Sequence, residues 1–298
     1  MDFVATIAID GLIDASWLFI VAVGLTLVFG VLNILNIAHG NLYAIGAYTA
    51  ATGVGWYYTG SGPPMLGYLV LVAAALAVAV ALGPLMERGL LRLFYERDEV
   101  LLVLVTYALF LILEDATKLI WGPNPYYAYE PYGLLGDISL FGLDYVAYDF
   151  LLVGLALLTG GLLWFGLNRT IIGKLVLAVI HDREMSRAMG INVTRVFVLV
   201  FTFGVFLAAL GGAFTAPKIS VQPGLSVTVI LLSFAVVVIG GLGSVEGAAL
   251  AALLVGLARS AAIHLMPSAE LFIVYLVMAG VLAFRPEGLF QRTALRKI

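Results

Sequence analysis

Polar residues interrupt a long uncharged stretch near the N-terminus, and they are the first side chains along the chain to suggest a function. The interruption consists of Asn33, Asn36, His39, Gly40 and Asn41. Hydrocarbon offers no hydrogen-bond partners, so such groups inside an apolar run should face protein or a water-filled path. Two interpretations are open. The segment is either a short polar turn at the inner membrane surface, or a broken helix whose Asn36 and His39 line or gate a path for a neutral or zwitterionic solute.

A second candidate lies in the basic loop 168–194. Asp182 is a good helix N-cap, Glu184 suits the positive start of a helix dipole, and Gly190 suits the left-handed residue beyond its end. These signals predict a helix of about eight residues, which is too short to be stable alone in water and should dock on another surface. That surface is either its own bundle with the lipid headgroups, or a groove on a partner protein. The candidate docking residues are Asp182, Arg183, Glu184, Arg187, Met189 and Gly190.

The third candidate is a glycine-rich reversal between two apolar segments. Its residues of interest are Gly240, Gly241, Gly243, Ser244 and Glu246. Glycines permit a tight backbone turn and close helix contact, and Glu246 stands where a helix begins and a negative charge is favourable. A tight turn with a capped helix start fits these residues at least as well as a helix break used in transport.

The composition argues against several kinds of chemistry. The chain has no cysteine, which excludes disulfides, thiolate metal sites and cysteine nucleophiles. The pair Gly173-Lys174 lacks the glycine that opens a phosphate loop, so we expect no ATPase site on this chain. His39, His181 and His264 are far apart in sequence, so we expect no metal site, and no cofactor is implied. A net charge of −3 gives no reason to expect a nucleic acid partner.

The apolar content places the chain in a membrane. Hydrophobic residues make up 63% of its 298 residues and charged residues 11%, against roughly 25% charged in soluble domains. Scanning for runs of about 20 apolar residues predicts an all-α multi-pass membrane protein, a bundle of about nine helices with eight to ten possible. We expect one transmembrane domain over residues 1–298. The predicted spans are 11–32, 37–58, 66–86, 100–121, 146–167, 195–215, 225–241, 245–263 and 270–285.

Basic residues mark the loops expected on the cytoplasmic side. They follow the third, fifth and ninth spans: Arg88, Arg92 and Arg97; Arg169, Lys174, Arg183, Arg187 and Arg195; and Arg285, Arg292, Arg296 and Lys297. The segment 122–145 has none and carries Glu130, Asp137 and Asp144 with several tyrosines, so we expect it to be an outer loop. All these loops agree on one orientation, with the N-terminus outside and the C-terminus in the cytoplasm.

Three separated pieces of the chain resemble the permease subunits of branched-chain amino acid ABC importers. The first is Gly24–Tyr48, with Asn-Ile-Ala-His-Gly at 36–40. The second is the loop with Asp182, Ala188-Met-Gly-Ile-Asn192 and the following Arg195-Val196. The third runs from Gly240-Gly-Leu-Gly-Ser244 to Arg285-Pro-Glu-Gly-Leu-Phe290. The three pieces cover nearly the whole chain in the order expected for that family.

The resemblance implies a subunit that forms the path of an ATP-driven importer in the cell membrane of a prokaryote. In such importers two permeases, commonly different ones, pair over two ATPase subunits that bind ATP, and an extracytoplasmic binding protein delivers the amino acid. Asp182–Gly190 would then be the coupling helix that docks on an ATPase. The chain resembles the smaller of the paired permeases. Branched-chain amino acids lead as substrate, while urea, short amides and other amino acids use similar permeases.

The competing interpretation is a stand-alone secondary carrier or channel for a small polar solute. Ion coupling would require ionisable residues near the middle of a span, and Glu114, Asp115 and Arg259 lie toward span ends. We expect these charges to be structural. Glu114 can pair with Lys118 on one helix face, and Arg259 either snorkels to the outer interface or pairs with a carboxylate such as Glu270. A membrane scaffold without transport leaves the polar helix break unexplained.

Overall fold

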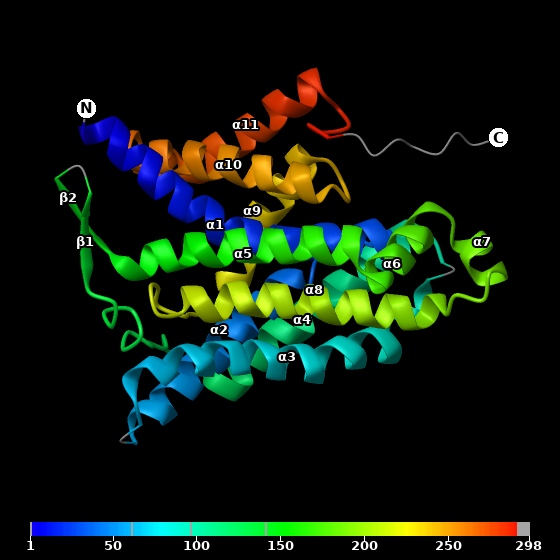
Figure 1. Cartoon of the computed structure of the whole chain (residues 1–298), viewed down its shortest axis with the longest axis horizontal. Helices are drawn as coiled ribbons and strands as arrows, with labels where there is room; N and C mark the ends of the chain where they lie inside the picture. The colour runs from blue at the N-terminus through cyan, green and yellow to red at the C-terminus, as the bar shows by residue number, and fades with distance from the viewer. Residues whose placement is uncertain (1, 61, 96, 141, 291–298) are drawn as a thin grey trace.

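A computed structural model of the chain describes residues 2–60, 62–95, 97–140 and 142–290 (Figure 1). Nine long helices fall on the predicted spans: α1 (Asp2–Leu32), α2 (His39–Tyr58), α3 (Gly67–Gly89), α4 (Glu99–Trp121), α5 (Ala147–Arg169), α8 (Val193–Thr215), α9 (Leu225–Gly240), α10 (Val245–Leu265) and α11 (Glu270–Phe284). Two short helices, α6 (Ile171–His181) and α7 (Arg183–Ala188), lie between α5 and α8. Strands β1 (Asp137–Leu140) and β2 (Leu143–Val146) form an antiparallel hairpin before α5.

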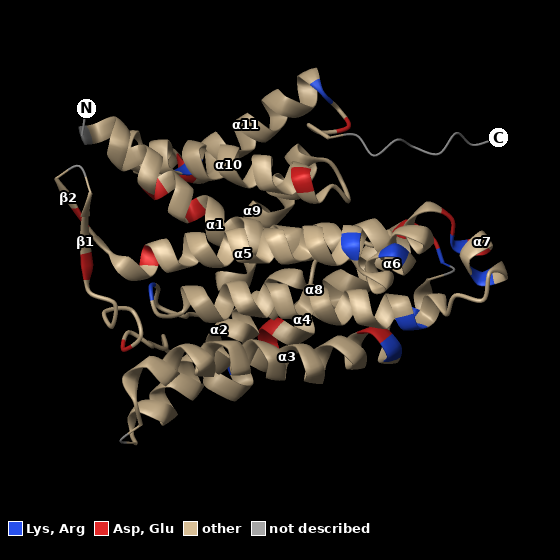
Figure 2. Cartoon of the chain, viewed as in Figure 1, with Lys and Arg blue, Asp and Glu red and all other residues tan. Residues whose placement is uncertain are grey.

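The all-α, multi-pass prediction is confirmed. Seven helices of the described chain are long and apolar enough to cross a membrane, while α2 is not among them and α9 has only 16 residues. Lys and Arg gather at the end of the bundle that carries α6 and α7, and the acidic hairpin lies at the other end (Figure 2). That separation fits the predicted orientation, although the count of nine spans and the orientation stay predictions. Arg292, Arg296 and Lys297, which entered the orientation argument, lie outside the described residues.

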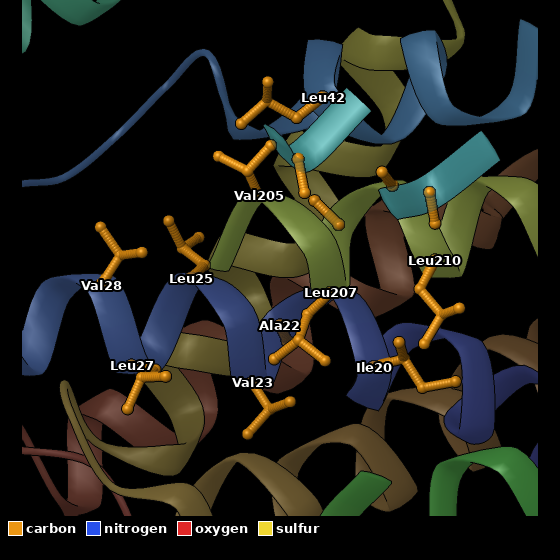
Figure 3. Close-up of a cluster of buried hydrophobic side chains, with 14 of the residues drawn as sticks. Ile20, Ala22, Val23, Leu25, Leu27, Val28, Leu42, Val205, Leu207 and Leu210 are labelled. Atoms are coloured by element: carbon orange, nitrogen blue, oxygen red, sulfur yellow. The ribbon is translucent and has the colours of Figure 1, made fainter. Parts of the chain in front are cut away.

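Helices α1 and α8 form the centre of the bundle, and most of their residues are buried. Side chains of both helices interdigitate in the core, among them Ile20, Leu25, Val205 and Leu207 (Figure 3). Small residues let the helix backbones approach closely, as expected where lipid supplies no hydrophobic drive for association. A Cβ added to Gly212 of α8 would lie 2.0 Å from the carbonyl oxygen of Tyr43 in α2. Helices α4, α5 and α11 lie around this centre and contain few buried residues.

Helix α2 begins inside the bundle rather than at the level where α1 ends. The Nε2 atom of His39, its first residue, is 3.0 Å from the carbonyl oxygen of Val21, a residue about 16 Å back along α1 from its end. The irregular segment 33–38 therefore runs from the end of α1 back toward the interior of the bundle. Helix α2 covers 39–58 of the predicted span 37–58, and its crossing of the membrane stays a prediction, because a run of apolar residues does not reveal the depth at which a helix starts.

Candidate functional site

The polar break between α1 and α2 is held by contacts with other helices. Asn33 ends α1 with a positive φ of 61°, a conformation that Asn tolerates better than most residues. Its amide donates to the carbonyl of Phe29 at 2.8 Å, which closes the last turn. Two residues later the carbonyl of Leu35 accepts a hydrogen bond from Thr106 Oγ1 of α4 at 3.1 Å. The break is thus a fixed part of the bundle, pinned between α1 and α4.

Asn36 and His39 are fully buried and only partly bonded. Neither amide atom of Asn36 has a hydrogen-bond partner in the described chain, and His39 bonds through Nε2 alone. A buried polar group without a partner costs about 1–3 kcal/mol. Native proteins keep few such groups, and in membrane proteins they mark paths for polar solutes. The geometry therefore disfavours an exposed polar turn at the inner surface, and the role of these two residues in lining or gating a path stays a prediction.

Glu114 of α4 connects Asn41 of α2 to the start of α9. The Asn41 amide donates to Glu114 Oε2 at 3.3 Å, while the amide of Gly224 donates to Glu114 Oε1 at 3.0 Å. Ser226 Oγ also hydrogen-bonds Glu114. Because Gly224 caps α9, the carboxylate sits at the positive end of that helix dipole. Sequence reasoning treated Glu114 as a structural charge paired with Lys118; that pair exists at 3.7 Å, but the link to α2 and α9 had no signal in the sequence.

Gly40 packs tightly against α9. A Cβ at this position would lie 2.4 Å from the carbonyl oxygen of Ser226 and 2.8 Å from the Cβ of Ile230. Any other residue would push the two helices apart at the level of the polar break. The glycine singled out from the sequence is therefore required for packing beside the buried asparagine and histidine.

The helix predicted in the basic loop is present as α7. The side chain of Asp182 caps it by accepting from the Met185 amide at 2.8 Å, and Gly190 takes the left-handed conformation with φ of 84° just beyond its end. Asn192 then caps α8 by accepting from the Arg195 amide at 3.0 Å. The helix covers six residues rather than about eight. The separate amphipathic helix α6, not a continuation of α7, precedes it.

The docking candidates face in two directions. Asp182, Glu184, Arg187, Met189 and Gly190 are exposed, and Met189 exposes 75% of its surface. Arg183 turns inward: its Nη2 donates to the Val31 carbonyl at 2.8 Å, and its guanidinium lies 5.2 Å from the centre of the Phe197 ring. Burial lowers the pKa of Arg183, and the nearby Arg187 adds to this effect. Arg183 therefore attaches α7 to the ends of α1 and α8, whereas the other five docking candidates face outward.

The glycine-rich reversal joins α9 to α10 and packs against the C-terminal segment. Gly240 and Gly247 touch through their backbones, and Ser244 Oγ caps α10 by accepting from the Gly247 amide at 3.0 Å. Gly241 and Gly243 have positive φ angles of 97° and 85°. The Phe290 amide donates to the Gly240 carbonyl at 3.1 Å. The segments 240–244 and 285–290, which both carry the family resemblance, are therefore in direct contact. Glu246 is exposed in the first turn of α10.

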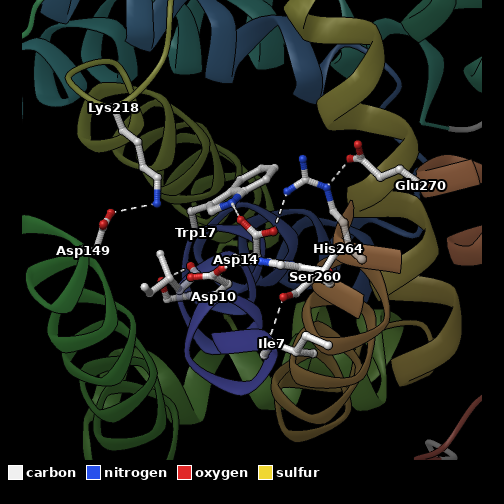
Figure 4. Close-up of polar contacts among 12 residues, drawn as sticks. Ile7, Asp10, Asp14, Trp17, Asp149, Lys218, Ser260, His264 and Glu270 are labelled. Atoms are coloured by element: carbon white, nitrogen blue, oxygen red, sulfur yellow. Dashed lines mark hydrogen bonds and ion pairs between the residues drawn. The ribbon is translucent and has the colours of Figure 1, made fainter. Parts of the chain in front are cut away.

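Charged side chains pair in the half of the bundle where α1, α5 and α11 begin (Figure 4). Arg259 Nε is 2.5 Å from Glu270, which confirms the pairing predicted for it, and its Nη1 is 2.8 Å from Asp14 on α1. Lys218 pairs with Asp149 at 2.7 Å. Nearby in the loop before α5, burial raises the pKa of Tyr132 to about 12, and Asp149 adds to the shift. Among the described residues no group of three or more His, Cys, Asp or Glu side chains is placed to hold a metal ion.

The bundle, with a buried polar break between its first two helices, defines a multi-pass membrane protein. Comparison with known proteins specifies this class further. The sequence model described as the permease component of the branched-chain amino acid transport system matches residues 7–282, so the chain belongs to that family.

Several curated relatives match over almost their whole length. The chain is 28% identical to the high-affinity branched-chain amino acid transport permease BraD of Pseudomonas aeruginosa, covering 97% of this chain and 96% of BraD. It is 23% identical to LivH of Escherichia coli K12 with the same coverage, and 25% identical to the probable permease LivH of Methanocaldococcus jannaschii over 93% of this chain and 90% of that protein. Among solved structures, PsaBC from Streptococcus pneumoniae in complex with Fab aligns with a TM-score of 0.48 at 13% identity, over 92% of this chain and 89% of that one.

Proposed function

We propose that this chain is the membrane-spanning subunit of an ATP-driven importer and that it carries branched-chain amino acids through the cell membrane. The observation that carries the proposal is the family match over residues 7–282. BraD and LivH, which align with the chain over almost their whole length, are named as branched-chain amino acid transport permeases. The chain does no covalent chemistry in this role. ATP binds on partner ATPases, and no cofactor is required on the permease itself.

Three regions carry the proposed work. Asn33, Asn36, His39, Gly40 and Asn41 line or gate the path, which the buried, unpaired amide of Asn36 supports. The exposed residues around α7 dock on an ATPase, and Arg183 transmits movement of α7 to the ends of α1 and α8. Gly240, Gly241, Gly243, Ser244 and Glu246 form the helix break, whose contact with 285–290 supports a joint between α9 and α10.

The assembly proposed is two permeases, alike or different, with two ATPase subunits and an extracytoplasmic binding protein. The loop 168–194 would meet the ATPases and the outer loop 122–145 the binding protein, both within a single transmembrane domain 1–298. A stand-alone carrier or channel is not favoured, because the relatives are transport-system permeases. Uptake coupled to ATP requires that the binding protein distinguish the two states of the bundle.

The test is to tag the chain in its host, solubilise it gently and identify the proteins that co-purify. Recovery of ATPase subunits and a second permease, together with ATP-dependent uptake of labelled leucine by membrane vesicles, is the expected result. A homo-oligomer without any ATPase, or leucine uptake that survives ATP depletion, would contradict the proposal. Competition by unlabelled leucine, urea and acetamide separates the substrate classes.

A further inference from the structure

The exposed surface of α4 has a side that becomes charged toward the end of the helix, the polar side, and a side that is apolar throughout. At 3.6 residues per turn, the polar side carries Val100, Leu104, Tyr107 and Leu111 in the first four turns of the helix and Glu114, Asp115 and Lys118 in its last turns. The other side carries only apolar residues: Leu101, Val105, Ala108, Ile112, Ala116 and Leu119. The buried stripe of Leu102, Thr106, Phe110 and Thr117 packs on the bundle between them. Because both sides belong to one helix at one depth, they can be compared residue by residue.

The polar side is exposed within the apolar length of the helix. The Asp115 and Lys118 side chains are 76% and 46% exposed, and their pair distance is 3.4 Å. Lys118 is followed only by Leu119 and Ile120, which are 87% and 69% exposed, and by Trp121, which ends the helix. The charges therefore precede the end of the apolar part of α4 rather than lying outside it. Exposed ionised side chains at such a position are unfavourable against lipid and favourable against water.

Glu114 connects this polar side to the interior. Its side chain is 14% exposed and contacts Lys118 at the surface, while its oxygens accept from Asn41 and Gly224 inside. A continuous line of polar groups thus runs from the exposed pair on α4 to the start of α2, where Asn36 and His39 keep unpaired buried atoms. Along this line lie the carboxylates of Glu114 and Asp115 and the ammonium group of Lys118. Such groups suit a solute that carries one positive and one negative charge.

We propose that the polar side of α4 lines the water-filled path by which a zwitterionic solute reaches the break between α1 and α2, and that the apolar side faces lipid. This inference rests on the proposed transport function and adds which helix face forms the path. In this arrangement a second permease forms the other wall of the path, and it faces Tyr107 and Leu111 rather than Ile112.

The absence of cysteine makes the test direct, since a single introduced thiol is the only one in the chain. The variants are Leu111→Cys with its neighbour Ile112→Cys as matched control, and Tyr107→Cys with Ala108→Cys. Each is expressed with its partner subunits and treated, in opened membrane fragments, with a charged, membrane-impermeant methanethiosulfonate. Thiols ionise in water and not in lipid, so positions 107 and 111 should react about tenfold faster than 108 and 112. Excess leucine should slow the reaction at 107 and 111 alone.

Equal rates within both pairs, or faster reaction at 108 and 112, would overturn the inference. Reaction of every variant after denaturation in detergent shows that the thiol is present, and the amount of inserted protein shows that the bundle has formed. All four positions are exposed, so none of the changes opens the core. ATP-dependent leucine uptake by the unaltered complex is measured alongside. If leucine uptake is normal but the thiols react at equal rates, only the inference that the polar side of α4 faces water is rejected. If leucine uptake is absent, the proposed function is rejected.

Discussion

The polar break after α1 and the docking segment around α7 are both short and polar, yet their polar groups are satisfied in opposite ways. In the docking segment, Asp182 and Asn192 cap helices within three residues of themselves, and Gly190 ends α7 locally. In the break, the Asn41 side chain bonds only to a residue of α4, and the Asn36 side chain has no partner among the described residues. The difference separates a segment built by neighbouring residues from one that exists only because distant helices surround it.

The largest expected effect comes from Gly40, where the break touches α9. Gly40→Ala should lower the free energy of unfolding by about 3 kcal/mol, because the new Cβ meets backbone atoms of Ser226 that cannot move alone. Gly55→Ala is the matched control in the same helix, since a Cβ there meets no atom within 4 Å. It should leave stability unchanged or raise it slightly. Thermal unfolding of the two variants in detergent measures the difference, and equal midpoints would mean that α2 and α9 are not in close contact.

Arg183 and Arg187 test whether the docking segment has separate inner and outer faces. Arg183→Gln should reduce stability by about 2 kcal/mol, because it removes a charged hydrogen bond to Val31 and the contact with Phe197. Arg187→Glu, at an exposed position, should change stability by less than about 0.5 kcal/mol but abolish ATP-dependent uptake and ATPase recovery. Unfolding midpoints and co-purification separate the two. Full uptake by the Arg187→Glu variant would exclude α7 as the docking helix.

The same contrast explains what the sequence could predict. The helices and their order follow from apolar runs, and the caps of α7 and α8 follow from Asp182 and Asn192, because each depends on residues a few positions apart. The depth at which α2 starts, the inward turn of Arg183 and the link from Asn41 to Glu114 depend on helices distant in sequence. Single-sequence patterns carry no information on such contacts. Even so, the residue types at 33–41 identified this region as a candidate site, because asparagine and histidine are rare inside apolar runs and usually have a functional role there.

Glu114 offers a smaller effect that bears on the break alone. Glu114→Gln should destabilise the protein by about 1–2 kcal/mol, because it removes the charge that the Gly224 amide and the start of α9 stabilise. Asp115→Asn, the neighbouring and largely exposed carboxylate, should change stability by less than about 0.5 kcal/mol. Thermal unfolding of both variants makes the comparison. If both changes are equally mild, Glu114 is an ordinary surface charge and does not hold α2 to α9.

The smallest expected effect is local to α7, and it tests whether this helix forms by its own caps. Asp182→Ala should destabilise α7 by about 1 kcal/mol, since the Met185 amide loses its acceptor. Asp182→Asn keeps an acceptor at the same place and should have almost no effect. Hydrogen exchange of the amides in residues 183–188 reports the local opening, which should speed up for the alanine variant while the rest of the bundle stays protected. Unchanged exchange in the alanine variant would mean that the inward contact of Arg183, rather than the cap, sets the helix, and the docking segment would then resemble the break in depending on distant partners.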